Sequence, residues 1–384
     1  MRCPKRSAGN MNLCRKSRGR TVGITFSGEI SKSVEEDMKV KLYQIRTYLR
    51  IAIVMTGCSL SLLIARSEAQ SFNFTPIDVP CSACPGGIAR RTAVGGINPG
   101  GDIVGVYTDA VGKQHGFLLS GGQFTTIDVP GALVGASGTL PTVARGISPS
   151  GEIVGQFTAP VNSSAPADFP EYCPGVGSTA CIKGFLYSRG KFSAVLFPGH
   201  PGAIPGRITP DGSMYGCLHD FDVMASMFSA AWTRLGDANL TAGGGELSDP
   251  TKSYPNSMHG GATPDGNAIV GFYVDMMTNH QHGYVLKNGV LQPYDVPNSI
   301  QTVVWDINPR QEIVGTYKDS EGKQHGFLQL PDGSAPMTLD VPSTPPFNAV
   351  STIAMGINPG GAIVGQYADT TGHTHGFLAV PTGE

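Results

Sequence analysis

The chain has 384 residues, of which 40% are hydrophobic and 15% are charged, a composition that can bury a core and excludes a disordered protein. Its 52 glycines and 29 prolines follow no three-residue period, which excludes collagen and favours an all-β protein dense in turns. From residue 70 onward there are 14 basic and 24 acidic residues, a net charge of 14 minus 24, or −10, which argues against a nucleic-acid partner.

The N-terminal segment has the pattern of a secretory signal. Residues 38–69 combine a basic stretch, an apolar run from Ile51 to Ile64, and small residues before a cleavage site after Ala69. The run is shorter than the ~20 residues that span a bilayer, so a cleaved signal is favoured over a retained anchor. Residues 1–37 are basic and lack a hydrophobic period; we interpret them as an unstructured upstream extension rather than a nucleic-acid arm. The domain at 71–384 is therefore expected to be secreted or periplasmic, free of the membrane and monomeric.

Five cysteines follow the signal. In an oxidising compartment Cys173 and Cys181, separated by a Gly- and Pro-containing loop, are expected to form a disulfide. Cys81 and Cys84 form a CxxC motif that could be a redox pair, but it follows a strand-like stretch rather than opening a helix, so a turn disulfide is favoured. Cys217 is expected to be single and buried.

One sequence unit recurs six times. The turn "NPGG" at 98 returns as "SPSG" at 148, "TPDG" at 209 and 263, "NPRQ" at 308 and "NPGG" at 358. The stretch "DIVGVY" at 102 returns at 152, 268, 312 and 362, with a divergent copy "SMYGCL" at 213. "HGFL" at 115 is matched at 183, 282, 325 and 375, and "AAWT" at 230 is taken as the third copy. The spacing between the starts of successive copies is typical of four-stranded β-propeller blades.

Each part of the unit predicts a strand or a turn. In the turn, Pro presets φ and the following Gly accepts a positive φ. "IVGxY" is a β-branched strand whose Gly lets a neighbouring backbone or ring approach closely. "HGFL" and "FTTIDVP" supply the third and fourth strands, and the Pro ends the last of them.

The two ends of the repeat array complement each other. Residues 72–80, "FNFTPIDVP", form a fourth strand with no preceding three, while the last copy ends after its third strand. Pairing the first with the last would remove exposed sheet edges. We therefore predict an all-β, six-bladed β-propeller of four-stranded blades, closed by the N-terminal strand completing the last blade.

These motifs resemble the bacterial extracellular repeat family named for its His-Ala-Phe signature. The resemblance covers the whole chain after the signal, although Gly replaces Ala at Gly116, Gly184, Gly326 and Gly376, and Ala230 stands where the third copy would carry His. It implies an exported repeat domain of unassigned biochemical role.

The recurring histidines invite a metal interpretation, which the repeat geometry disfavours. Equivalent positions in different blades lie apart around a ring and cannot converge on one ion, so His115, His282, His325 and His375 are expected to make hydrogen bonds within their own blades, to a turn carbonyl or an Asp. The recurring Asp78, Asp128, Asp295 and Asp340 are treated alike. No nucleophile elbow, HExxH motif or phosphate loop occurs, so no cofactor or metal is expected.

A functional site is expected where the copies differ. Five residues that break the repeat on the first strands are predicted to approach the central channel, with packing or channel salt bridges as the alternative: Arg145, Arg207, His259, Trp305 and Asp306. Long insertions after the second strands predict an interaction face. Its chemically useful residues are Asp168, Glu171, Tyr172, His219, Asp220 and Asp222.

Two functional classes follow. The first is a non-enzymatic binding or scaffold propeller that recognises a glycan or a protein. The second is a propeller enzyme, a glycoside or lactone hydrolase or a lyase, with a channel-mouth acid such as Asp306 or Glu171. A glycosidase needs two carboxyl groups about 5 to 10 Å apart, and the first strands supply one acid, so binding is favoured.

Overall fold

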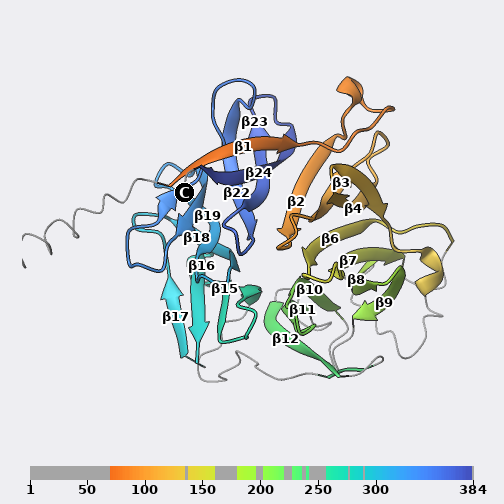
Figure 1. Cartoon of the computed structure of the whole chain (residues 1–384), viewed down its shortest axis with the longest axis horizontal. Helices are drawn as coiled ribbons and strands as arrows, with labels where there is room; N and C mark the ends of the chain where they lie inside the picture. The colour runs from red at the N-terminus through yellow and green to blue at the C-terminus, as the bar shows by residue number, and fades with distance from the viewer. Residues whose placement is uncertain are drawn as a thin grey trace, which may run out of the picture. The chain divides into compact units, whose positions relative to one another are not determined.

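The computed structural model describes residues 70–134, 137–160, 180–195, 202–219, 227–235, 239–241, 257–275, 277–288 and 290–382 (Figure 1). All of them lie in the second of two compact units, Gln70–Glu384. This part of the chain is all-β, as predicted: it has no α-helix, and its two short 3₁₀ helices are η1 (Pro85–Gly87) and η2 (Gly131–Val134). A search of the same residues finds no helix with the length and apolar character needed to span a membrane. The extension at 1–37 and the signal at 38–69 lie outside the described residues.

The strands form six repeats, and in repeats one to five four consecutive strands pair antiparallel in chain order. Repeat one contains β2 (Arg91–Ile97), β3 (Ile103–Thr108), β4 (Gln114–Ser120) and β5 (Gln123–Ile127). Repeat two contains β6 (Thr142–Ile147), β7 (Ile153–Pro160), β8 (Ala180–Ser188) and β9 (Lys191–Val195). Repeat three contains β10 (Gly202–Ile208), β11 (Met214–His219), β12 (Met227–Leu235) and β13 (Asn239–Thr241).

The later repeats follow the same order. Repeat four contains β14 (Ser257–Ala262), β15 (Ala268–Val274), β16 (Gln281–Lys287) and β17 (Val290–Tyr294). Repeat five contains β18 (Gln301–Ile307), β19 (Ile313–Lys318), β20 (Gln324–Gln329) and β21 (Met337–Thr338). Repeat six contains β22 (Ala349–Ile357), β23 (Ile363–Asp369) and β24 (Thr374–Thr382).

The N-terminal strand completes repeat six. β1 (Ser71–Ile77) pairs antiparallel with β24, placing Phe74 opposite Ala379 and Pro76 opposite Phe377, and Figure 1 shows it alongside that strand. The predicted pairing of these two strands is therefore present. A parallel bridge between Arg91 and Thr374 joins repeats six and one into one eight-stranded sheet.

The first strands of the repeats contact one another in cyclic order. β2 contacts β6, and the series continues through β10, β14, β18 and β22, which in turn contacts β2. Side-chain amides on the adjoining turns also link repeats: Asn308 donates to the carbonyl of Asn358, and Asn358 to the carbonyl of Asn98. These contacts place residues of all six first strands around one region, where the candidate site lies.

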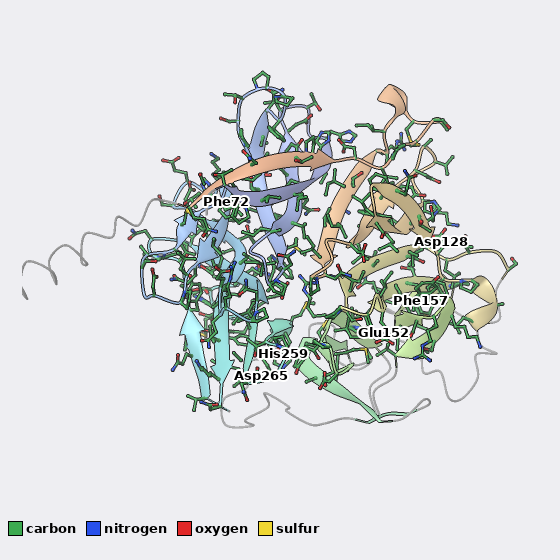
Figure 2. The ribbon with its side chains drawn as sticks, in the orientation of Figure 1. Phe72, Asp128, Glu152, Phe157, His259 and Asp265 are labelled. Carbon is green, nitrogen blue, oxygen red and sulfur yellow. A yellow bond between two sulfur atoms is a disulfide. The ribbon has the colours of Figure 1, made fainter. Side chains whose placement is uncertain are left out.

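The core lies between successive sheets. One apolar cluster joins Val104 and Ile127 of repeat one to Ile153 and Phe157 of repeat two, and Figure 2 labels Phe157. In every repeat except the third, the glycine of the "IVGxY" position makes room for a ring. A Cβ on Gly105 would lie 2.2 Å from the Ala93 carbonyl oxygen and 2.7 Å from the Phe117 ring, which confirms the close approach predicted for this position.

Repeat three differs from the alignment made on sequence. The register pairs Gly216 with Ala230, whereas Gly105 pairs with Phe117 in repeat one. Residues 228–231, "FSAA", therefore occupy the "HGFL" position, and the assignment of "AAWT" was wrong by two residues. Phe228, not Ala230, stands in the histidine position. The error arose because this copy has lost both the His and the aromatic residue that would fix its register.

The cysteine predictions can be compared with the described residues. The turn disulfide between Cys81 and Cys84 is confirmed, with Cα atoms 5.3 Å apart. Cys181 is buried and disulfide-bonded, while its predicted partner Cys173 lies outside the described residues. Cys217 is buried and takes part in no disulfide, as expected, and burial raises the pKa of its thiol to about 12.

Candidate functional site

Every first strand carries a β-bulge at the same place. The ladder with the second strand skips one residue between Val94 and Gly96, and the other five first strands skip the equivalent residue. A bulge leaves the extra residue unpaired and re-aims it. The six bulged residues are Gly95, Arg145, Gly206, Gly260, Trp305 and Met355.

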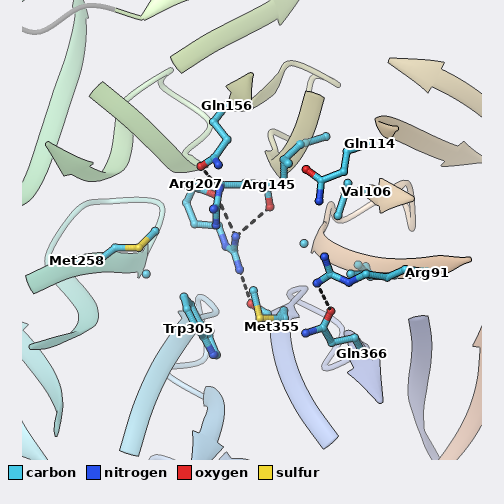
Figure 3. Close-up of a pocket in the computed structure, with 17 residues that line it drawn as sticks. Arg91, Val106, Gln114, Arg145, Gln156, Arg207, Met258, Trp305, Met355 and Gln366 are labelled. Atoms are coloured by element: carbon cyan, nitrogen blue, oxygen red, sulfur yellow. Dashed lines mark hydrogen bonds between the residues drawn. The ribbon is translucent and has the colours of Figure 1, made fainter. Parts of the chain in front are cut away.

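All six bulged residues line one cavity of about 280 Å³ (Figure 3). Glycine is needed where a neighbouring strand passes close: a Cβ on Gly95 would lie 2.8 Å from the Arg145 carbonyl oxygen, and one on Gly260 would lie 2.6 Å from that of Trp305. The remaining side chains at these positions differ in chemistry. Arg145 is cationic, Trp305 is aromatic and packs edge-to-face on Phe272 at 5.5 Å, and Met355 is apolar.

Three arginines and three glutamines supply the polar part of the cavity wall. Arg145 donates from Nε to Oε1 of Gln156 at 3.1 Å, and Arg91 donates from Nη2 to Oε1 of Gln366 at 3.3 Å (Figure 3). Gln114, from β4, also lines the cavity. Burial lowers the pKa of Arg145, and the charge of Arg207 adds to this effect. No Asp or Glu is among the described residues that line the cavity.

Arg207 separates this cavity from a second, smaller one. It lines both, and the smaller space, about 90 Å³, is bordered by the prolines of the Asn/Ser/Thr–Pro turns. Its Nη1 donates to the carbonyls of Arg145 and Gly206 at 3.0 and 2.9 Å, and its Nη2 donates to the carbonyl of Met355. The side chain thus crosses from repeat three to repeats two and six.

Asp306 is the counter-ion of Arg207. Its Oδ2 lies 3.4 Å from Arg207 Nε, and the two carboxylate oxygens accept the backbone N–H groups of Ile307 and Ile357. Burial raises the pKa of Asp306, while the Arg207 charge and the two N–H donors oppose that rise. A Cβ on Gly261 would lie 2.1 Å from Oδ1, so glycine there leaves room for this carboxylate.

The structure contradicts the prediction for His259. Its side chain is 1% exposed and does not line the cavity, because strand alternation turns it away from the side of Met258 and Gly260. Its Nδ1 lies 2.6 Å from the Tyr284 hydroxyl, which also approaches Ser229 Oγ at 3.1 Å and donates to the carbonyl of Met258. Burial lowers the pKa of His259 to about 3, so we assign it to the packing of repeats three and four (Figure 2).

The other four residues predicted to approach the channel line one or both of the two cavities. Arg145 and Trp305 line the larger cavity, Asp306 lines the smaller one, and Arg207 lines both. Four further cavity residues were not predicted from the sequence: Arg91, Gln114, Gln156 and Gln366. A signal existed for two of them: Gln156 and Gln366 occupy the variable position of "IVGxY", and Val106 at the same position also lines the cavity.

The predicted loop face is described only at its strand ends. Asp168, Glu171, Tyr172, Asp220 and Asp222 lie outside the described residues, and of His219 only the backbone, the last residue of β11, is described. Gln114 is the first residue of β4, which is equivalent to β8 and β12, the third strands that the predicted segments precede in the chain. Arg91, the first residue of β2, lies at the same end, because Arg91 and Gln114 both pair toward Thr108 of β3. The larger cavity is therefore at the same end of the strands as the predicted face.

The recurring histidines make hydrogen bonds within their own sheets. His115 Nδ1 lies 2.7 Å from Asp128 Oδ2, and its Nε2 lies 3.2 Å from Asp109 Oδ2. The ring stacks on Tyr107 with centroids 5.0 Å apart. Equivalent His–Asp bonds join His282 to Asp295, His325 to Asp340, and His375 to Asp78. The partner is an Asp in all four repeats, and each ring stacks on a tyrosine of the neighbouring strand.

Repeat six adds a third group to its His–Asp pair. Asp78, His373 and His375 place potential metal-ligand atoms within 4.8 Å of one another, the one such trio in the described part of the chain. Repeats one and five have Lys113 and Lys323 in place of His373, whose Nε2 is buried without a hydrogen-bond partner. The absence of a metal stays a prediction, and a metal titration would test it here.

No family model matches the sequence, and no curated protein matches it. Among solved structures, the chain is similar to TolB from Acinetobacter baumannii, with 14% identity and a TM-score of 0.45 over 74% of this chain and 64% of that one. It is also similar to the six-bladed β-propeller lectin of Aleuria aurantia, with 12% identity and a TM-score of 0.43 over 77% and 96% of the two chains. For the Trypanosoma rangeli sialidase in complex with the inhibitor DANA, the identity is 10% and the TM-score 0.42, over 81% and 59%. The chain thus spans less than two thirds of the TolB and sialidase chains.

Proposed function

We propose that residues 71–384 form a six-bladed β-propeller closed by β1, and that the chain belongs to the His-Ala-Phe repeat family. The pairing of β1 with β24 and the cyclic contacts of the first strands support the closure. The recurring Tyr–His–Asp arrangement supports the family, because it gives the signature histidine the same partners in four repeats. The Cys81–Cys84 disulfide and the signal pattern support an exported location, since disulfides persist in oxidising compartments.

We further propose that the domain is a non-enzymatic binding protein that takes a ligand, a glycan or part of a protein, in the 280 Å³ cavity. One observation carries this proposal: the cavity is built from the bulged residues, where the copies differ, and no described carboxylate lines it. The channel acid, Asp306, is held by Arg207 and two backbone N–H groups. It is therefore poorly placed to serve the hydrolase or lyase that the sequence left as the alternative.

A glycan array of the chain from Gln70 onward, run beside hydrolase and lyase screens, tests this function. We expect binding without turnover. Gly206→Leu should abolish binding by filling the cavity, because a Cβ there meets only the flexible end of Met258 at 3.1 Å and the Tyr215 carbonyl at 3.6 Å. Val111→Leu, at a position 85% exposed, is the control that should bind normally. Turnover that Asp306→Ala abolishes would contradict the non-enzymatic function, and full binding by Gly206→Leu would contradict the cavity.

A further inference from the structure

We propose that the larger cavity is an anion site that binds the planar carboxylate of a ligand of monosaccharide size, such as a sugar acid. This inference rests on the proposed function, in that it assumes the cavity to be the ligand site, and it names the chemical class of the ligand.

The charge of the cavity wall favours an anionic ligand. Arg91, Arg145 and Arg207 line the cavity, and no Asp or Glu among the described residues lines it with them. Asp306 approaches from the smaller cavity and pairs with Arg207. Neither Arg91 nor Arg145 has an ion-pair partner in the described ranges. Among the described residues, the two guanidinium charges of Arg91 and Arg145 therefore have no counter-ion in the cavity.

The Arg145 guanidinium has hydrogen-bonding capacity that no described residue uses. Arg145 is partly buried, and of its five N–H donors only Nε has a partner in the described part of the chain, at Gln156. A charge that is partly withdrawn from water and has open donors gains from a partner that satisfies them. The guanidinium presents its donors as a planar fork, which matches a carboxylate in a bidentate arrangement.

Glutamine side chains orient the arginines of the cavity wall. The carboxamide oxygens of Gln156 and Gln366 accept hydrogen bonds from Arg145 and Arg91, so the two glutamines hold the guanidinium groups in place (Figure 3). Those bonds use acceptor oxygens and leave the amide N–H groups as further donors. Gln114 lines the same wall and has no partner among the described residues. Such a wall suits a ligand that combines a carboxylate with hydroxyl groups.

The size of the cavity favours a ligand of one sugar ring. The cavity volume of about 280 Å³ is just below the ~300 Å³ at which typical small-molecule pockets begin. Arg207 forms the floor, and Trp305 and Met355 add apolar surface. A single sugar ring fits this space better than an extended polymer.

Calorimetric titration of the chain from Gln70 with glucuronate, glucose, acetate and sulfate tests the inference. We expect glucuronate to bind at least about tenfold more tightly than glucose, and acetate to compete with it. Binding of sulfate in preference to both carboxylates would overturn the assignment of a carboxylate. Arg145→Gln and Arg91→Gln should each weaken glucuronate binding about tenfold or more. Arg189→Gln, which removes an exposed charge at the β8–β9 turn, should leave it unchanged.

The outcomes separate this inference from the proposed function. Equal binding of glucose and glucuronate, lost in Gly206→Leu, would overturn the anion site and keep the cavity as a ligand site. Glucuronate binding that survives Gly206→Leu would overturn the cavity itself. Failure of all four probes to bind would overturn the anion site.

Thermal unfolding of Arg145→Met without ligand gives an independent readout. If the guanidinium awaits an anion, removing its partly buried charge should leave the Tm unchanged or raise it, and glucuronate should raise the Tm of the unsubstituted chain only. A lower Tm for the ligand-free variant would show that Arg145 serves the fold, and would overturn the proposal.

Discussion

The outer strands and the bulged positions of the inner strands follow opposite rules. On the third strand and just after the fourth, four repeats carry the same His–Asp pair, at distances from 2.6 to 2.9 Å. At the bulges, six equivalent positions carry four residue types, and all six line one cavity. The His–Asp positions meet the same packing demand in four sheets and are alike, whereas the positions that share one cavity carry an arginine, a tryptophan and a methionine beside three glycines. In a repeat protein, a binding site should therefore be sought where the copies differ.

The largest loss of stability is expected when the Arg207–Asp306 ion pair is broken. Arg207→Met leaves the Asp306 carboxylate buried without its counter-ion, which should lower the free energy of unfolding by about 3–5 kcal/mol. Denaturant unfolding followed by fluorescence measures it. The double variant Arg207→Met/Asp306→Asn should recover much of the loss, because the buried charge is removed and the amide oxygen can still accept an N–H. A loss below about 1 kcal/mol in the single variant would contradict this account of the pair.

A repeated glycine should be nearly as sensitive. Gly105→Ala places a Cβ 2.2 Å from the Ala93 carbonyl oxygen and 2.7 Å from the Phe117 ring, an overpacking that should cost about 3 kcal/mol. Gly100→Ala is the matched control, since its Cβ comes no closer than 3.3 Å to the Asn98 side chain and should change stability by about 0.5 kcal/mol or less. Equal stability of the two variants would show that the sheets yield more readily than their spacing implies.

The His–Asp arrangement should make stability depend on acid. Burial tends to raise the pKa of Asp369, but hydrogen bonds from Thr371, His373 and His375 lower it to about 2. A lowered pKa stabilises the fold above the unfolded value near 3.8, and this stability is lost as the pH falls from about 4 to 2. Asp369→Asn should flatten the rise in unfolding free energy over that range.

Acid titration of the unfolding free energy compares this variant with a control. Glu321→Gln removes an acid whose side chain has no hydrogen-bond partner in the described residues, and it should keep the original slope. Identical slopes for Asp369→Asn and the unsubstituted chain would remove the assigned role of Asp369.

The smallest effect is expected at a turn. Gln311 has φ +62° where the equivalent Gly101 has φ +85°, so a residue with a side chain occupies a conformation that favours glycine. Gln311→Gly should relieve this backbone cost. It should also lose the hydrogen bond from Lys287 and raise the entropy of the unfolded chain, and both effects lower stability. We expect a net stabilisation below about 1 kcal/mol. A thermal melt that shows destabilisation would mean that the Lys287 bond outweighs the backbone cost.

Much of the fold could be predicted because turns and strands obey local rules. The Asn–Pro–x–Gly turn, the close approach at Gly105 and the pairing of β1 with β24 all follow from patterns in the sequence. The register of repeat three could not be predicted, because it depends on cross-strand pairing that its residues no longer mark.

The site was predictable in part. Arg145 and Trp305 stood out because they interrupt the repeat. The bulges could not be read from the sequence, since they arise from pairing between two strands, and so the burial of His259 beside Tyr284 was missed. Arg91 was also missed, because it borders the cavity through a contact with Gln366, 275 residues away.

The union of β1 with β24 has a consequence for biosynthesis. Asp78 and His375 are bonded although 297 residues separate them, so β1 cannot pair until β24, which is synthesised long after it, is available. Until then Phe74 lacks the ring of Phe377, whose centroid lies 5.8 Å from its own, and the open edge of β23 can recruit another chain. Translation that stops before residue 374 should therefore yield a product prone to aggregate, because β1 and β23 would each keep an unpaired edge.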